Sequence, residues 1–237
     1  MTITIDGGVV TGTTSLAKNL GLTFGLPRID SGSIYRALTY LVLKEGADPA
    51  DEAACIRLAK AAELEMPDGE VIKINGVTVV EWVDGQRIDQ LHTAEVDRSV
   101  AVVAAYEQVR EVVKQTQRQF AGTHGAIADG RDTGTVVFPQ AELKLFLVCE
   151  EGEAAKRRSE ADGRIVTIAE VKERNEADRQ HKFGALAKAH DAVEIDTTHL
   201  TAGEVSELVL GLVEMDTKDR PSYIGRETES GEILRRP

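Results

Sequence analysis

Short apolar runs alternate with longer stretches of helical periodicity along most of the chain. The short runs have the length and composition of buried parallel strands, and the stretches between them are long enough for crossover helices. This alternation predicts an α/β fold assembled from βαβ units. The candidate core strands are residues 2–5, 26–29, 126–129, 143–148 and 193–195.

Several helices have start or stop signals. Asp48, followed by Pro49 and Asp51, predicts the start of one helix. Residues 97–120 have apolar positions at helical spacing and are predicted to form one long amphipathic helix. Two Thr/Glu pairs have the spacing of a capping box, and two glycines are expected to end helices. The pairs are Thr167/Glu170 and Thr201/Glu204, and the glycines are Gly21 and Gly46.

The middle and the end of the chain do not follow this alternation of apolar strands and amphipathic helices. Residues 70–88 contain the turn signals Asn75-Gly76 and Asp84-Gly85 between strand-like runs, which predicts a small hairpin insertion. After Glu214 the sequence is polar and unpatterned. Residues 215–237 are therefore expected to form a flexible tail.

Composition narrows the possible partners. The 237 residues are 42% hydrophobic and 29% charged, as in a soluble globular protein, and the formal net charge is −12. A nucleic acid or an anionic membrane would require a basic excess, so neither is expected as a partner. No apolar run approaches a membrane span, and the N-terminal residues lack a signal-peptide pattern. These features predict a cytoplasmic protein.

The first chemical signal is the segment GGVVTGTTS, which lies between a predicted strand and a predicted helix. A glycine-rich turn in this position presents backbone N–H groups and a helix N-terminus to phosphate. A tight strand-to-helix turn that binds nothing is the alternative. The expected nucleotide-binding residues are Gly7, Gly8, Val9, Val10, Thr11, Gly12, Thr13, Thr14 and Ser15.

This loop departs from the phosphate-loop pattern at Thr13, where the pattern has lysine. The lysine ammonium neutralises the β and γ phosphates, and a unit charge at about 4 Å is worth roughly 4 kcal/mol at an effective dielectric of about 20. Lys18 lies one helical turn beyond Thr14. Because helical side chains tilt toward the N-terminus, Lys18 is a candidate replacement. It is equally compatible with an ordinary surface position.

Taken in order, several further segments resemble the cytidylate kinases, which are nucleoside monophosphate kinases of the P-loop class. The resemblance covers about residues 1–214, and an archaeal branch of the family is similar in having Gly-Thr-Thr in the loop. The matching segments are IDGGVVTGTTSLAKNLG from Ile5, DSGSIYRALT from Asp30, VAAYEQVRE from Val103, AIADGRDTGTVVFPQAELKLFLV from Ala126, KRR from Lys156, VKERNEADR from Val171 and IDTTHL from Ile195.

The resemblance implies a three-layer P-loop kinase fold with a parallel five-stranded sheet. Residues 1–30 and 121–214 would form the P-loop core, residues 31–120 an acceptor-binding insertion, and residues 150–180 a lid region within the core. The implied activity is ATP- and Mg²⁺-dependent phosphoryl transfer to CMP or dCMP by a monomer.

Phosphoryl transfer requires cations around the transition state, so arginines from several segments are the expected signature. Alone, each would more often be a solvated surface residue. By resemblance, the catalytic residues would be Arg131, Asp129, Arg157 and Arg174. Lys18 is added to them as the candidate replacement for the loop lysine. By the same resemblance, Arg158 would lie in the lid over ATP, with Arg164 nearby. Thr14 and Asp129 would hold Mg²⁺, with a turn-capping role as the alternative for Asp129. The acceptor residues would be Ser31, Arg36, Arg110, Arg131, Asp132, Arg174 and Asp178.

The chain departs from the family at positions that concern the base and the phosphates. The family's cytosine-contacting serine falls on Ala101, and the basic residue after it falls on Val102. The family pattern Arg-Asp-x-Arg-Asp-x-x-Arg is RNEADRQH here, from Arg174, so two arginines are lost. Two alternatives therefore stay open. One is a kinase of the same fold that acts on another phosphate- or phosphonate-bearing metabolite, and the other is a nucleotide-binding protein without turnover.

Overall fold

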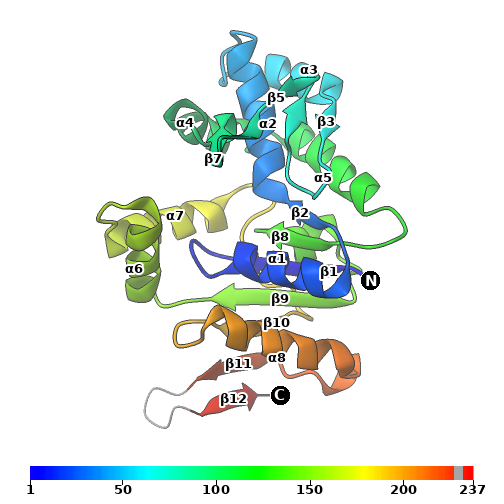
Figure 1. The fold of residues 1–237 in the computed structure, drawn as a ribbon, viewed down its shortest axis with the longest axis vertical. Helices are drawn as coiled ribbons and strands as arrows, with labels where there is room; N and C mark the ends of the chain where they lie inside the picture. Colours follow the sequence, from blue (N-terminus) through cyan, green and yellow to red (C-terminus); the bar gives the residue numbers. More distant parts are fainter. Residues whose placement is uncertain (227–231, 237) are drawn as a thin grey trace. The chain divides into compact units, whose positions relative to one another are not determined.

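The computed structural model describes residues 1–226 and 232–236. The chain forms two compact units, Met1–Leu26 with His124–Pro237 and Pro27–Thr123 (Figure 1). The corresponding boundaries predicted from the sequence are residues 30 and 120. We call these the core unit and the insertion unit and describe each by itself.

The core unit contains a mostly parallel sheet. Its strands follow the order β12-β11-β10-β9-β1-β8, and each neighbouring pair is parallel except β11 and β12. The α/β class, with a mostly parallel sheet flanked by helices, is confirmed. The predicted number of five parallel strands is too small, because β11 and the antiparallel β12 extend the sheet. The strands are β1 (Ile3–Gly7), β8 (Ile127–Gly130), β9 (Leu143–Val148), β10 (Val193–Asp196), β11 (Tyr223–Arg226) and β12 (Ile233–Arg236).

The central strand β1 alternates apolar and polar residues, so its two faces have different contacts. Ile3 and Ile5 are fully buried in a cluster with α1 (Thr13–Phe24) and α8 (Ala202–Glu214). Because successive side chains on a strand point to opposite faces, Thr4 and Asp6 face the other side. Fully burying an aliphatic side chain contributes about 1.5–3 kcal/mol, so this cluster fixes the register of the strand that leads into the glycine-rich loop.

The signals at helix ends are mostly correct. Both predicted capping boxes are confirmed, at the N-termini of α7 (Ile168–Gln180) and α8. Gly46 follows α2 (Ser31–Lys44) with a φ of 67°. The prediction for Gly21 is wrong, because α1 continues through Gly21 to Phe24. Gly25 ends this helix instead, in the left-handed conformation, and donates its N–H to the Gly21 carbonyl.

The helices of the insertion unit differ from the predicted pattern at one point. Residues 97–120 do not form one helix, because the chain turns between α4 (Ala94–Val103) and α5 (Glu107–Ala121). Tyr106 is extended there, and its hydroxyl donates to the Pro49 carbonyl at 3.0 Å. Tertiary contact thus overrides local periodicity. The unit also contains β2 (Arg28–Asp30) and α3 (Glu52–Ala61), which Asp51 caps.

The predicted hairpin region forms two small sheets. One contains β3 (Leu64–Glu65), β4 (Lys73–Ile74) and β5 (Val77–Thr78), and the other contains β6 (Val80–Val83) and β7 (Gln86–Asp89). Both turn signals are confirmed. The pairs Asn75-Gly76 and Asp84-Gly85 all have positive φ values, as a type I′ turn requires.

The C-terminal segment contains strands that its composition did not indicate. In β11, Ile224 is 1% exposed and joins the core cluster, and Arg226 forms an ion pair with Glu204 of α8. The prediction that residues 215–237 contain no regular structure is therefore wrong for β11 and β12. That this segment is flexible remains a prediction. Residues 227–231 and 237 of this segment lie outside the described residues. Within the described part of the chain, no helix has the length and apolar character needed to cross a membrane.

Candidate functional site

The loop between β1 and α1 is tightly folded. A Cβ on Gly7 would lie 2.5 Å from Thr11 Oγ1 and 2.8 Å from the Leu147 carbonyl oxygen, so only glycine fits. Val10 has a φ of 55°, which is rare for a β-branched residue, and Gly12 has a φ of 96° just before the helix starts. The loop leads directly into the helix N-terminus, where backbone N–H groups have no intrahelical partners and can bind an anion.

Thr14 and Asp129 bring two oxygen ligands together beside this loop. Thr14 lies in the first turn of α1 and Asp129 near the end of β8, and Thr14 Oγ1 donates to Asp129 Oδ2 at 3.0 Å. Asp129 is only 5% exposed. A hydroxyl and a carboxylate are ligands that Mg²⁺ prefers, so this pair fits the ion that the sequence predicts.

Asp6 fixes the turn after β8, a role that was not predicted from the sequence. Its carboxylate accepts hydrogen bonds from the N–H groups of Thr133 and Gly134, both at 2.8 Å, and from the Thr133 hydroxyl. Burial raises the pKa of Asp6 to about 6, against the opposing effect of these hydrogen bonds. Asp6 thereby shapes the turn that carries Arg131 and Asp132. The sequence feature that could have indicated this role is a charged residue within an otherwise apolar strand.

The position of the missing lysine is occupied by a side chain that packs against the loop. A Cβ built on Gly7 would lie 3.0 Å from Thr13 Cγ2, so the threonine methyl faces this glycine. Lys18 is exposed on α1 and makes no hydrogen bond or ion pair with the described residues. Its ammonium is therefore not committed to a protein carboxylate.

Arg157 on α6 (Glu151–Asp162) supports the loop from another direction. It donates to Glu153 Oε1 at 3.0 Å and to the Thr197 carbonyl at 2.8 Å. The Thr197 hydroxyl in turn donates to the Thr11 carbonyl of the loop at 3.0 Å. Because its guanidinium is held in this way, Arg157 supports the loop through Thr197.

The two other lid arginines are also paired. Arg158 donates to Asp162 at 2.8 Å, and Arg164 donates to Glu170 at 2.9 Å. These pairs are partly exposed to solvent, so each is worth about 1 kcal/mol or less and can open when an anion binds.

Arg131 and Arg174 meet at one carboxylate. Asp178 on α7 accepts from Arg131 Nε at 2.7 Å and lies 3.4 Å from Arg174 Nε. The Asp178 side chain is 8% exposed, whereas that of Arg174 is 52% exposed. The structure therefore brings together three of the predicted acceptor residues, with one excess positive charge among them.

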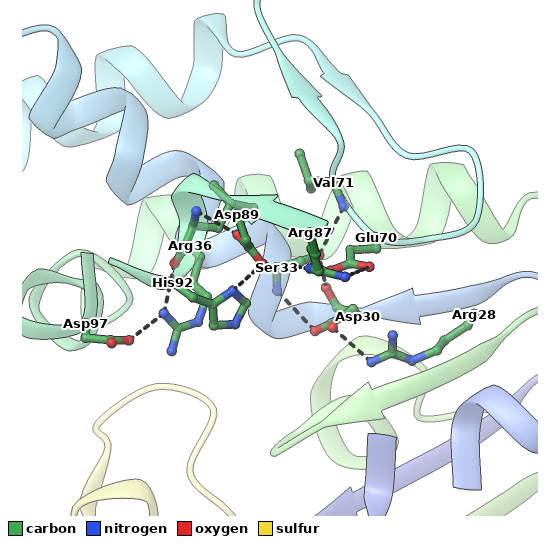
Figure 2. Close-up of polar contacts among 11 residues, drawn as sticks. Arg28, Asp30, Ser33, Arg36, Glu70, Val71, Arg87, Asp89, His92 and Asp97 are labelled. Carbon is green, nitrogen blue, oxygen red and sulfur yellow. Dashed lines mark hydrogen bonds and ion pairs between the residues drawn. The ribbon is translucent and has the colours of Figure 1, made fainter. Parts of the chain in front are cut away.

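In the insertion unit, Arg36 is held from two sides. Its Nη1 donates to the Leu91 carbonyl at 3.0 Å. It also donates to Asp97 Oδ1 at 2.6 Å, as Figure 2 shows. The carbonyl of Leu91 is itself placed by Asp89, which accepts from the Leu91 N–H at 2.8 Å. Asp89 also accepts from Arg87, so a chain of polar contacts orients Arg36.

The other predicted residues of this unit also have protein partners. Ser31 donates to Gln117 Oε1 at 2.9 Å in a buried position, and the Arg110 guanidinium lies over the Tyr35 ring at 5.2 Å. Ala101 and Val102 are exposed on α4. Asp132 belongs to the core unit, where it is 6% exposed, and its carbonyl accepts from the Val136 N–H at 2.9 Å.

Comparison with known proteins agrees with this geometry. The family described as cytidylate kinase matches residues 3–215. The chain is 36% identical to the cytidylate kinase of Bacillus velezensis over 228 residues, which cover 92% of this chain and 98% of that protein. It is 38% identical to the cytidylate kinase of Bacillus licheniformis over 223 residues, which cover 90% of this chain and 95% of that protein.

The fold and the loop define a phosphotransferase of the P-loop kinase class. The extent of the match then assigns the family: the chain belongs to the cytidylate kinase family. It is accordingly a kinase of the nucleoside monophosphate type.

Proposed function

We propose that the protein transfers the γ-phosphoryl group of ATP to CMP or dCMP and that it requires Mg²⁺. The observation that carries this proposal is the Thr14–Asp129 contact at 3.0 Å beside the glycine-rich loop, in a chain that matches the cytidylate kinase family over residues 3–215. Thr14 and Asp129 would hold the metal ion, which when bound supplies positive charge at the transferring phosphoryl group.

The remaining residues bind and orient. Backbone N–H groups of residues 7–14 would hold the donor phosphates. Arg174, exposed at the edge of the Asp178 pair, would contact the acceptor phosphate together with Arg131. Arg36 would do the same from the insertion unit, once it leaves its ion pair with Asp97. Positioning and charge are the main demands of this chemistry, and these side chains supply both.

A different acceptor is the second candidate, and the observation that favours it is the pair Ala101 and Val102 on α4. Neither side chain offers a hydrogen bond to a base, although both are exposed. A site that pairs fewer polar groups with cytosine discriminates less strongly against other acceptors.

A coupled assay of ADP release tests the proposal. With Mg-ATP as donor, we expect the highest kcat/KM for CMP or dCMP, and lower values for UMP, AMP and phosphonate acceptors. Equal rates on CMP, UMP and AMP would favour the second candidate. No ADP release with any acceptor would indicate a nucleotide-binding protein without turnover.

A further inference from the structure

Asn175, on α7, contacts the glycine-rich loop. Its Oδ1 accepts a hydrogen bond from the Val9 N–H at 2.9 Å. A Cβ on Gly8 would lie 2.6 Å from the same oxygen, so the absence of a side chain at residue 8 is what admits Asn175. The contact joins positions 166 residues apart.

The Val9 N–H is one of the loop donors that a bound phosphate would use, since loops of this kind hold phosphate through successive backbone N–H groups. A charge-assisted hydrogen bond to phosphate is roughly twice as strong as one to a neutral amide. The carboxamide of Asn175 therefore satisfies this donor, but it is a weaker partner than a phosphate would be.

We propose that Asn175 is a positioning residue that occupies the Val9 N–H until the donor phosphate displaces it. The identity of that ligand as a nucleotide phosphate rests on the proposed function, whereas the competition for the Val9 N–H does not depend on which acceptor the enzyme uses.

Displacement of Asn175 has a consequence for the acceptor side. Asn175 directly follows Arg174 and lies one helical turn before Asp178, whose carboxylate binds Arg131. The α6–α7 segment also has its own small apolar cluster, formed by Ala154, Ala155, Val166 and Val171. Release of the Val9 N–H would therefore free α7 from the loop next to Arg174 and Asp178.

An asparagine suits this role better than an aspartate would. A carboxylate at residue 175 would accept the Val9 N–H more strongly and would repel the incoming phosphate. The neutral amide makes the contact and releases it without an electrostatic penalty, which a reversible contact requires.

Calorimetric titration with ADP in the absence of Mg²⁺ tests this competition. Removal of one neutral acceptor should make Asn175→Ala bind ADP about 2- to 10-fold more tightly, the range expected for one hydrogen bond. Asn175→Asp should bind ADP more weakly than the wild type. Asn19→Ala is the matched control, because it removes an exposed amide on α1 whose hydrogen bond within the described part of the chain goes to the Ser206 hydroxyl. Its affinity for ADP should be unchanged.

Hydrogen exchange of the Val9 amide, followed by NMR, provides a second readout that a purely structural role would not change. We expect Val9 to be protected in the free wild type, to exchange quickly in free Asn175→Ala, and to be equally protected in both proteins when ADP is bound. Equal or weaker ADP binding by Asn175→Ala, or equal Val9 exchange in the two free proteins, would overturn the proposal. A protein that shows the expected ADP affinities but releases no ADP with any acceptor would overturn the proposed function alone.

Discussion

Thr14 and Asp129, which are 115 residues apart in the chain, are joined by a hydrogen bond of 3.0 Å beside the glycine-rich loop. In Asp129→Asn the amide removes the negative charge that would hold Mg²⁺, and a unit charge at this range is worth a few kcal/mol. We therefore expect kcat to fall by about 10²- to 10³-fold.

Affinity for ADP measured without Mg²⁺ serves as the control for Asp129→Asn, because it should change little. Thr14→Ser retains the hydroxyl and should keep most of the activity in the same assay. Wild-type kcat in Asp129→Asn would contradict the assignment of this pair to the metal ion.

Asp132 is the candidate contact for the acceptor base. Asp132 is 6% exposed, in the turn that Asp6 holds. If its carboxylate accepts a hydrogen bond from cytosine, Asp132→Ala should lower kcat/KM for CMP by about 10- to 100-fold, the value of a hydrogen bond to a charged group. Affinity for ADP should be retained. An equal loss toward CMP, UMP and AMP would show that Asp132 does not contribute to base recognition.

Lys18 is the candidate replacement for the missing loop lysine. Its ammonium makes no ion pair with the described residues, in contrast to Arg157, Arg158 and Arg164. If Lys18 offsets transition-state charge in place of the loop lysine, Lys18→Ala should lower kcat by about a hundredfold, roughly 3 kcal/mol.

Lys218→Ala is the matched control for Lys18→Ala, since Lys218 is exposed at the surface beside Asp216. It should leave kcat unchanged. The same steady-state assay applies to both variants. An unaltered kcat in Lys18→Ala would show that Lys18 does not offset this charge and would leave the lid arginines as the candidates.

Asp6 provides a prediction about pH and stability. Burial raises its pKa from 3.8 to about 6 in the folded protein. Because the folded state binds this proton more tightly than the unfolded state, the contribution of Asp6 to stability is present below about pH 4 and is lost as the pH rises through about 6. The raised pKa corresponds to about 3 kcal/mol.

Urea unfolding of the wild type and of Asp6→Asn, which has no carboxyl group to titrate, measures this effect. The free energy of unfolding of the wild type, relative to the variant, should decrease by about 2 kcal/mol between about pH 4 and pH 7, most of the full effect of about 3 kcal/mol. A relative increase over this range would mean that the hydrogen bonds from Thr133 and Gly134 outweigh burial.

Most of the core strands could be predicted because burial of one or both faces imposes a local pattern of apolar residues. The break at Tyr106 could not, since it depends on a contact with Pro49, which lies 57 residues away. Similarly, Gly25 rather than Gly21 ends α1, because either glycine is locally compatible with a helix end and only the packing of α1 decides between them.

In the candidate site, too, some features follow from local sequence and others depend on distant contacts. The glycine-rich loop and the Thr14–Asp129 pair follow from residue types at the ends of a predicted strand and at the start of a predicted helix. The contact of Asn175 with Val9 and the support of the loop by Arg157 through Thr197 depend on how distant segments pack. No local pattern of residues encodes them.

The central claim is that this loop supports phosphoryl transfer without its lysine. The most direct measurement is ADP formation from Mg-ATP and CMP by the wild type and by Thr13→Lys. We expect measurable transfer to CMP by the wild type, and a kcat in Thr13→Lys that is modestly changed or lowered by crowding of the residue that offsets the charge. A wild type that is silent toward every acceptor, but becomes active on introduction of this lysine, would contradict the claim.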